Sequence, residues 1–211
     1  MKNCIVVGAG IHYNHKPLPA PGDIVIAVDG GYEYLQRIDI HADVIIGDFD
    51  SLSVRPQHPN IIELAKEKDD TDMLAALKFG LHKDCLTFHI YGGTGGRIDH
   101  TIANLQCLAY LSLQGAQGFL YGKDCIMTCI RNGSMAFDSS YRGTVSVFSH
   151  SDAAKGICLD GLKYRLHNAE LNNFYPLGIS NEFIGIDSCI SVKDGMIIII
   201  FPYNKNRRNH L

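Results

Sequence analysis

The stretch Asp43-Val44-Ile45-Ile46-Gly47-Asp48-Phe49-Asp50-Ser51 decides how the rest of this sequence is interpreted. Residues 44–46 are β-branched and continuous, a pattern typical of a strand buried on both faces of a parallel sheet. Gly47 then permits a sharp bend or the close approach of a ligand. In an extended segment the side chains of Asp48 and Asp50 point the same way, so both carboxylates can bind one hard cation such as Mg²⁺. The simpler alternative is an Asp-rich turn at the end of a strand.

The composition is that of an ordinary soluble protein with one large domain or two small ones. The 211 residues are 46% hydrophobic and 19% charged, which allows a sizeable core. Lys plus Arg number 19 against 22 for Asp plus Glu, so the charge indicates no nucleic-acid or membrane partner. The seven Cys form no C-x-x-C pair, which favours reduced thiols and a cytoplasmic protein. The apolar runs are too short for a membrane span or a signal peptide.

The first half of the chain repeatedly places unusual residues directly after an apolar strand. The expected strands are Cys4–Val7, Ile24–Val28, Val44–Ile46, Asn60–Leu64 and Leu86–Tyr91. They are followed, in order, by Gly8–Gly10, Asp29, Asp48 with Asp50, Lys68–Asp72 and Gly92–Asp99. In an open parallel sheet, ligands bind beyond the carboxyl ends of the strands. Because several carboxylates at that edge would repel one another, we expect a divalent metal ion to hold them, and protonation of the acids is the alternative.

The segment Lys68-Asp69-Asp70-Thr71-Asp72 precedes an expected helix with Leu74, Leu77 and Leu81 on one face. Either Asp70 or Thr71 can serve as the N-cap, and acids near a helix N-terminus are favoured by the helix dipole. Three carboxylates and a threonine exceed what a cap requires. Lys68 beside them suits an anionic ligand as well as a salt bridge.

Two glycine-rich loops are candidates for phosphate binding. Gly8-Ala9-Gly10 lacks the third glycine of a dinucleotide-binding loop, and Pro17 and Pro19 prevent the helix such a loop requires. Residues 92–97 (Gly-Gly-Thr-Gly-Gly-Arg) lead into a helix whose expected apolar stripe is Ile98, Ile102, Leu105 and Leu108 or Ala109. Backbone N–H groups and the helix dipole favour a phosphate there, and Arg97 offers a fork for its oxygens. The alternative is a flexible linker.

From about Gly118 the pattern changes to short strands and hairpins. The expected strands are Phe119–Tyr121, Ile126–Ile130, Thr144–Phe148 and Ile190–Ile197, with a turn at Asn132-Gly133. We therefore predict an α/β N-terminal domain with a mostly parallel sheet, residues 1–132, followed by an all-β C-terminal sandwich domain, residues 133–211. Residues 161–166 and 177–182 are expected to be loops.

The order of these motifs resembles the thiamin pyrophosphokinase family. The resemblance runs nearly end to end, through Asp29-Gly30-Gly31, Gly47–Ser51, Lys68–Asp72, Gly92–His100, Gly161–Tyr164 and Leu177–Glu182. It implies a first domain that binds ATP and Mg²⁺ and a second that binds thiamin and dimerises. Members transfer the pyrophosphoryl group of ATP to the thiamin hydroxyl and release AMP. They act as homodimers, with thiamin near the subunit interface.

The resemblance also implies roles for individual residues. Catalytic and metal-binding roles fall to Asp48, Asp50, Asp72 and Asp99. ATP or phosphate binding is implied for Asp29, Lys68, Thr71, Gly95, Arg97 and His100, and thiamin binding for Ser180 and Asn181. Either Asp50 or Asp72 would accept the proton of the thiamin hydroxyl.

Two features depart from the family pattern. Arg165 stands where the family usually has proline, and the sequence holds no Trp to stack on the thiamin ring. Phe174, Tyr175 and Phe183 are the candidate substitutes.

Two other functions compete with this interpretation. In a phosphohydrolase of the aspartyl-phosphate type, Asp48 would be the nucleophile and Asp50 the acid, although that family resembles this stretch only locally. In a non-catalytic sensor, the first domain would bind Mg-nucleotide and the second would recruit a partner.

Overall fold

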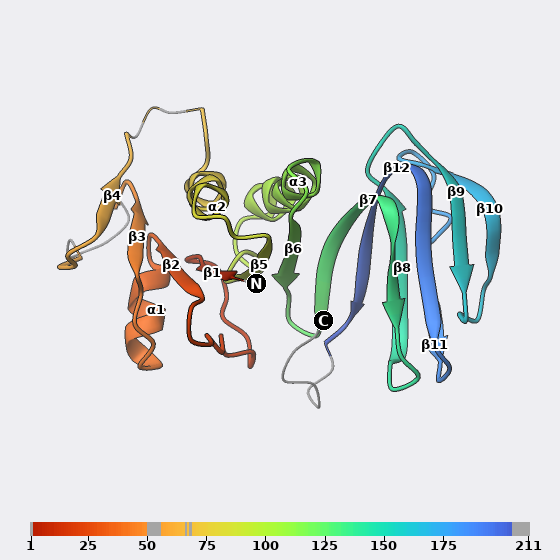
Figure 1. The fold of residues 1–211 in the computed structure, drawn as a ribbon, viewed down its shortest axis with the longest axis horizontal. Coiled ribbons are helices and arrows are strands. Elements are labelled where there is room, and N and C mark those ends of the chain that lie inside the picture. Colours follow the sequence, from red (N-terminus) through yellow and green to blue (C-terminus); the bar gives the residue numbers. More distant parts are fainter. Residues whose placement is uncertain (1, 50–55, 66, 68, 204–211) are drawn as a thin grey trace. The chain divides into compact units, whose positions relative to one another are not determined.

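The computed structural model describes residues 2–49, 56–65, 67 and 69–203. The chain divides into two compact units, Met1–Lys123 and Asp124–Leu211 (Figure 1). Within the described residues, no helix is both long and apolar enough to cross a membrane.

The first unit is built on a parallel sheet. Its strands are β1 (Asn3–Val7), β2 (Ile24–Val28), β3 (Val44–Gly47), β4 (Ile61–Glu63), β5 (Thr87–Tyr91) and β6 (Gln117–Tyr121). They lie in the order β6-β5-β1-β2-β3-β4, and each neighbouring pair is parallel. The five strands expected before residue 100 are confirmed. The assignment of Phe119–Tyr121 to the β-rich half is wrong, because β6 continues the parallel ladder beside β5.

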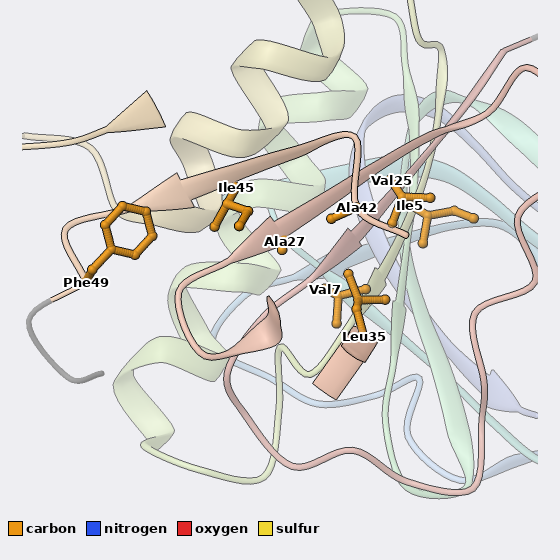
Figure 2. Packing of buried hydrophobic residues seen from close by; sticks show 8 residues of the cluster. All are labelled: Ile5, Val7, Val25, Ala27, Leu35, Ala42, Ile45 and Phe49. Carbon is orange, nitrogen blue, oxygen red and sulfur yellow. The ribbon is translucent and has the colours of Figure 1, made fainter. Parts of the chain in front are cut away.

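Helices cover both faces of this sheet. Helix α1 (Gly31–Arg37) packs Leu35 into a cluster on one face, formed by Ile5, Val7, Val25, Ala27, Ala42, Ile45 and Phe49 (Figure 2). Helix α2 (Asp72–His82) lies on the other face, since Cys4 points there while its neighbour Ile5 points to α1. A Cβ on Gly80 of α2 would collide with Cys4 and Phe88, so this glycine lets the helix approach the sheet closely.

The buried faces of α2 and of α3 (Ile98–Leu113) differ from the expected stripes. Of the three leucines expected to face inward on α2, Leu77 is fully buried, and the buried face is Met73, Ala76, Leu77 and Gly80. On α3, Leu108 and Ala109 are buried as expected, whereas Ile98 is 78% exposed and Ile102 is 55% exposed. The stripe is rotated because Asn104 faces inward, where its amide donates to Gly93 O at 2.7 Å.

The second unit is an antiparallel β structure. Its strands are β7 (Cys125–Phe137), β8 (Arg142–Ser149), β9 (Ala153–Asp160), β10 (Leu166–Asn172), β11 (Asn181–Ile184) and β12 (Ser188–Pro202). The long strand β12 pairs with β7 along most of its length, with β9 in its first half and with β8 in its second half. Strand β10 extends the ladder beyond β9, and β11 pairs with β8. The all-β character is as expected, and the sandwich arrangement stays a prediction.

The expected turn at Asn132-Gly133 is wrong. Strand β7 runs without a break through both residues, and the ladder with β12 shifts register between Val192 and Met196. Asn132 adopts a left-handed conformation (φ 47°), and its Oδ1 accepts a hydrogen bond from Gly195 N at 2.8 Å. The residue types that form a hairpin turn here form an irregularity inside a long strand. The two units therefore separate at Lys123/Asp124, whereas a boundary between residues 132 and 133 would cut β7.

Candidate active site

A cavity of about 650 Å³ lies at the carboxyl ends of the strands of the first unit. The loops after β1, β2, β3 and β5 and the first turns of α2 and α3 form its wall. This is the edge at which the sequence predicts a ligand site. A larger cavity, about 700 Å³, lies at the amino ends of the strands, beside Asp23 and Asp43. Both of these carboxylates accept hydrogen bonds from backbone N–H groups, which gives them a structural role.

Three carboxylates meet in the wall of the 650 Å³ cavity. Asp29 follows β2, Asp48 follows β3, and Asp72 is the first residue of α2. One oxygen from each lies within 4.8 Å of the others, and all three side chains are half-buried. Oxygen ligands at this spacing suit a hard divalent cation. Among the described residues, these three acids could hold a metal ion together.

The pKa of Asp29 is raised where the three carboxylates meet. Burial, reinforced by the negative charges of Asp72 and Asp48, raises its pKa from 3.8 to about 7. A cation beside the cluster would stabilise the ionised form of all three acids and reverse this shift. The chemistry of the donor set therefore fits a divalent metal.

The backbone around the cluster adopts conformations that few residues tolerate. Asp29 (φ 47°) and Phe49 (φ 58°) are both left-handed, which is uncommon for aspartate and an outlier for a bulky ring. The Phe49 ring is buried in the hydrophobic cluster that also contains Leu35 of α1, and it lies beyond Ile45 (Figure 2). This packing holds the ring in place. A Cβ on Gly47 would overlap Asp29 Oδ1, so the glycine makes room for this carboxylate.

The expected extended geometry of Asp48-Phe49-Asp50 is therefore wrong at Phe49. Its left-handed φ bends the chain between the two acids. Asp50 itself lies outside the described residues, as does Lys68.

The start of α2 explains how Asp72 is placed. Thr71 is the N-cap, with Oγ1 accepting a hydrogen bond from Leu74 N at 3.1 Å. Asp70, which also lines the cavity, forms an ion pair with Lys78 at 2.6 Å. These contacts fix the turn that directs Asp72 toward the other acids.

The two glycine-rich loops bind each other through their backbones. Gly10 N donates to Gly92 O at 2.7 Å, and Ile11 N donates to Thr94 O at 3.0 Å. A Cβ on Gly8, Gly10 or Gly92 would collide with the opposite loop. The alternative of a flexible linker is thus wrong, because these glycines allow a tight backbone contact.

Gly95 and Gly96, the last two glycines of this loop, do not contact the loop that contains Gly8 and Gly10 in the way that Gly92 does. Gly95 has a positive φ of 85° and packs against Tyr13, whereas a Cβ on Gly96 would meet open space within the cavity.

The start of α3 carries a separate charged pair. Arg97 donates to both carboxylate oxygens of Asp99, at 2.6 and 3.2 Å. The hydrogen bonds from Arg97 hold the pKa of Asp99 below its ordinary value. Both side chains are exposed, 74% for Arg97 and 60% for Asp99. Arg97 and His100 line the cavity, whereas Asp99 is paired with its own arginine and lies outside the three-carboxylate cluster.

Two buried polar residues of the cavity wall were given no individual role from the sequence. Asn104 is buried on α3 and fixes the glycine-rich loop through Gly93 O. Thr94 is buried within that loop. An asparagine at an inward helix position is a signal that could have identified the first. Thr94 carries no comparable sequence signal, because it lies inside a motif already explained by its glycines.

The second unit places the two expected thiamin-binding residues differently. Ser180 is exposed, with a φ of 59°, and its N–H donates to Ser146 Oγ at 3.1 Å. Asn181 is only 4% exposed and exchanges two hydrogen bonds with the backbone of Tyr164, at 2.6 and 2.9 Å. Its amide therefore fixes the loop that carries Tyr164.

The candidate aromatic residues also differ in availability. Phe183 is 5% exposed and packs against Phe137 and Tyr141, so it is wrong as a stacking residue for a ligand. Phe174 and Tyr175 are 82% and 63% exposed and can meet a ligand or a partner.

A parallel α/β sheet with clustered acids and a glycine-rich loop at its carboxyl edge has the parts that phosphoryl transfer requires: candidate metal ligands and a candidate phosphate-binding loop. Comparison with known proteins narrows this interpretation. Residues 18–119 match the family model described as "Thiamin pyrophosphokinase, catalytic domain", and residues 134–197 match "Thiamin pyrophosphokinase, vitamin B1 binding domain". The chain belongs to the thiamin pyrophosphokinase family.

Individual relatives agree with this assignment over nearly the whole chain. A thiamine pyrophosphokinase of Bacillus subtilis is 29% identical over 182 residues, covering 83% of this chain and 85% of the relative. A crystal structure of the enzyme from that organism has a TM-score of 0.84 at 27% identity, over 97% of this chain and 100% of that one. A thiamin pyrophosphokinase family protein of Enterococcus faecalis has a TM-score of 0.79 at 28% identity, with the same coverage. The phosphohydrolase and sensor alternatives are not favoured, because both units match one enzyme family.

Proposed function

We propose that this protein transfers the pyrophosphoryl group of ATP to the hydroxyl of thiamin, giving thiamin diphosphate and AMP. One observation carries the proposal: in the unit that matches the catalytic-domain model, three converging carboxylates and a glycine-rich loop line the same cavity. The match of the second unit to a vitamin B1 binding domain supports thiamin as the acceptor.

We propose that Mg²⁺ binds at the carboxylate cluster. Asp48 and Asp72 are its proposed ligands, and Asp50, which lies outside the described residues, is kept as a ligand from the sequence resemblance alone. We propose Asp29 as a further metal ligand because it lies beside Asp48 and Asp72, although the family resemblance implies phosphate binding for it. A carboxylate within 4.8 Å of two others suits a cation and would repel a phosphate oxygen. The metal would neutralise charge that develops on the phosphates during transfer.

The remaining residues of the cavity are proposed to bind the phosphate chain and to move one proton. Arg97, His100 and the loop around Gly95 follow β5 in the chain, and Thr71 is the N-cap of α2. Lys68, which lies outside the described residues, is kept from the sequence resemblance alone. Asp99 would join the metal only after phosphate oxygens compete for Arg97, since the two side chains are paired in this structure. Asp50 or Asp72 would accept the proton of the thiamin hydroxyl as that oxygen attacks the β-phosphorus.

The thiamin site is proposed to lie on the second unit. Ser180 offers an exposed hydroxyl, and Asn181 would act by holding the Tyr164 loop. Phe174 or Tyr175 would stack on the thiamin ring in place of the absent tryptophan.

We further propose a homodimer. Exposed apolar side chains on both units supply surface for it: Ile98, Ile102, Phe174, Tyr175, Leu177 and Ile179. Sedimentation equilibrium would test this assembly, and a concentration-independent monomer mass would contradict it. A cytoplasmic location agrees with seven free cysteines.

Product analysis tests the reaction. Protein, MgCl₂, ATP and thiamin are incubated, and nucleotides and thiamin esters are separated by chromatography. We expect AMP and thiamin diphosphate in equal amounts. Formation of ADP with thiamin monophosphate would contradict attack at the β-phosphorus, and phosphate release without thiamin would favour a hydrolase.

A further inference from the structure

The wall of the 650 Å³ cavity contains a hydroxyl group that the fold leaves without a hydrogen-bond partner. Thr94 is 7% exposed and lines the cavity. Among the residues that the structure describes, none forms a hydrogen bond with its Oγ1 atom. Buried hydroxyl groups are nearly always hydrogen-bonded, so an unpaired one in a cavity wall requires an explanation.

The loop around Thr94 is held too firmly for this hydroxyl to be a by-product of a loose backbone. Thr94 O accepts a hydrogen bond from Ile11 N at 3.0 Å, and the preceding Gly93 O accepts one from Asn104 Nδ2 at 2.7 Å. The contacts between the two glycine-rich loops fix the backbone on either side. The one remaining freedom is rotation about χ1, which moves Oγ1 among three staggered positions.

We propose that Thr94 Oγ1 donates a hydrogen bond to an oxygen of the ATP phosphate chain. This inference rests on the proposed function, which supplies ATP as the ligand of this cavity. Arg97, which is paired with Asp99, and His100 follow the same loop in the chain and also line the cavity, so this part of the wall offers hydrogen-bond donors. A hydroxyl donor beside them suits an anionic oxygen, and a hydrogen bond to a charged acceptor is among the stronger kinds.

Two substitutions at this position separate binding from structure. Thr94→Val replaces the hydroxyl with a methyl group of nearly equal shape, and Thr94→Ser keeps the hydroxyl. Isothermal titration calorimetry measures binding of ATP and of inorganic tripolyphosphate, each with Mg²⁺. Tripolyphosphate carries the phosphate chain without the nucleoside. The melting temperature without ligand is measured in parallel.

We expect Thr94→Val to weaken binding of both ligands by about 10-fold, equivalent to about 1.4 kcal/mol. We expect Thr94→Ser to stay within about 3-fold of the wild type. The ligand-free melting temperature of Thr94→Val should equal or exceed that of the wild type, because an unpaired buried hydroxyl is removed.

Three results would overturn the proposal. Unchanged affinity of Thr94→Val for both ligands would show that the hydroxyl does not touch the phosphates. Weaker binding of ATP alone would place the contact on the nucleoside. A ligand-free melting temperature that is lower in Thr94→Val than in the wild type, but unchanged in Thr94→Ser, would show that the hydroxyl forms a structural hydrogen bond. If the wild type binds neither ligand, the nucleotide assignment itself fails, and the role of Thr94 with it.

Discussion

The acids of the first unit fall into two groups that look alike in the sequence and differ in the structure. Asp29, Asp48 and Asp72 come from three separate elements and meet half-buried, within 4.8 Å of one another. Asp99 lies at the exposed start of α3 and is neutralised by Arg97, two residues away. Their surroundings move the pKa in opposite directions, upward for Asp29 and downward for Asp99.

This difference shows what makes an acidic residue part of a metal site. The first group has like charges for neighbours, so the folded protein without a cation carries an electrostatic cost at this point. The second has already gained an opposite charge and needs no cation. Position at a strand end or helix start does not separate the two cases, but burial and the sign of the nearest charge do.

The largest effect is expected from Asp72→Asn, which removes one of the three carboxylates of the cluster. Turnover of thiamin should fall by more than about 100-fold, since even changes outside the direct ligands of a metal cost about 10–100-fold. Steady-state kinetics with saturating Mg-ATP measures this. Asp84→Asn at the other end of α2 is the matched control, because Asp84 is exposed and its φ of 61° suits asparagine equally well. Wild-type turnover in the Asp72 variant would remove this residue from the site.

A smaller effect is expected from Asp29→Asn in metal-free buffer. Because the pKa of Asp29 is about 7 in the folded protein and near 3.8 when unfolded, its contribution to stability is lost as pH rises through this window. The variant should therefore be more stable than the wild type at pH 8 and lose this advantage near pH 4. With allowance for solvent screening we expect about 1–2 kcal/mol, or several degrees in Tm.

Thermal melts from pH 4 to pH 8 check the sign of this effect. Asp99→Asn is the control of opposite sign, since a lowered pKa stabilises the folded protein above the unfolded pKa and is lost as pH falls. A difference curve for Asp29→Asn that is flat with pH would show that the clustered charges do not interact.

The smallest effect is expected from Thr71→Ala, which removes the cap that places Asp72 and leaves Asp99 untouched. The free energy of unfolding should fall by about 1 kcal/mol, as for other lost N-caps. Thr71→Ser keeps the accepting oxygen and should retain most of it. Urea denaturation measures both variants. Equal losses in the two would mean that the threonine methyl group, and not the cap, stabilises the turn.

Much of the first unit could be predicted from its sequence. Continuous β-branched runs such as Val44–Ile46 indicate buried parallel strands, and the place where each run stops locates the edge that carries the site. The convergence of Asp29 with Asp48 and Asp72 follows from that edge. What the sequence does not contain is the partner of each acid, so Asp99 looked equivalent to the others until its pairing with Arg97 was visible.

Other features depended on packing that local patterns do not encode. Phe49 bends the chain because its ring is buried beneath the sheet, which a D-x-D motif alone does not reveal. Asn132-Gly133 has the composition of a hairpin turn, but its neighbours continue pairing with β12. Asn181 lies in a motif expected to contact a ligand, and its amide is engaged by the backbone of Tyr164.

The most direct test of the account is binding of Mn²⁺, a paramagnetic substitute for Mg²⁺ at oxygen ligands, without nucleotide. Electron paramagnetic resonance of free Mn²⁺ gives the affinity for the wild type, Asp72→Asn and Asp99→Asn. The account predicts that the wild type binds Mn²⁺, that Asp72→Asn binds at least about 10-fold more weakly, and that Asp99→Asn binds as the wild type does. Equal weakening in both variants, or no binding by the wild type, would contradict a metal site formed by Asp29, Asp48 and Asp72.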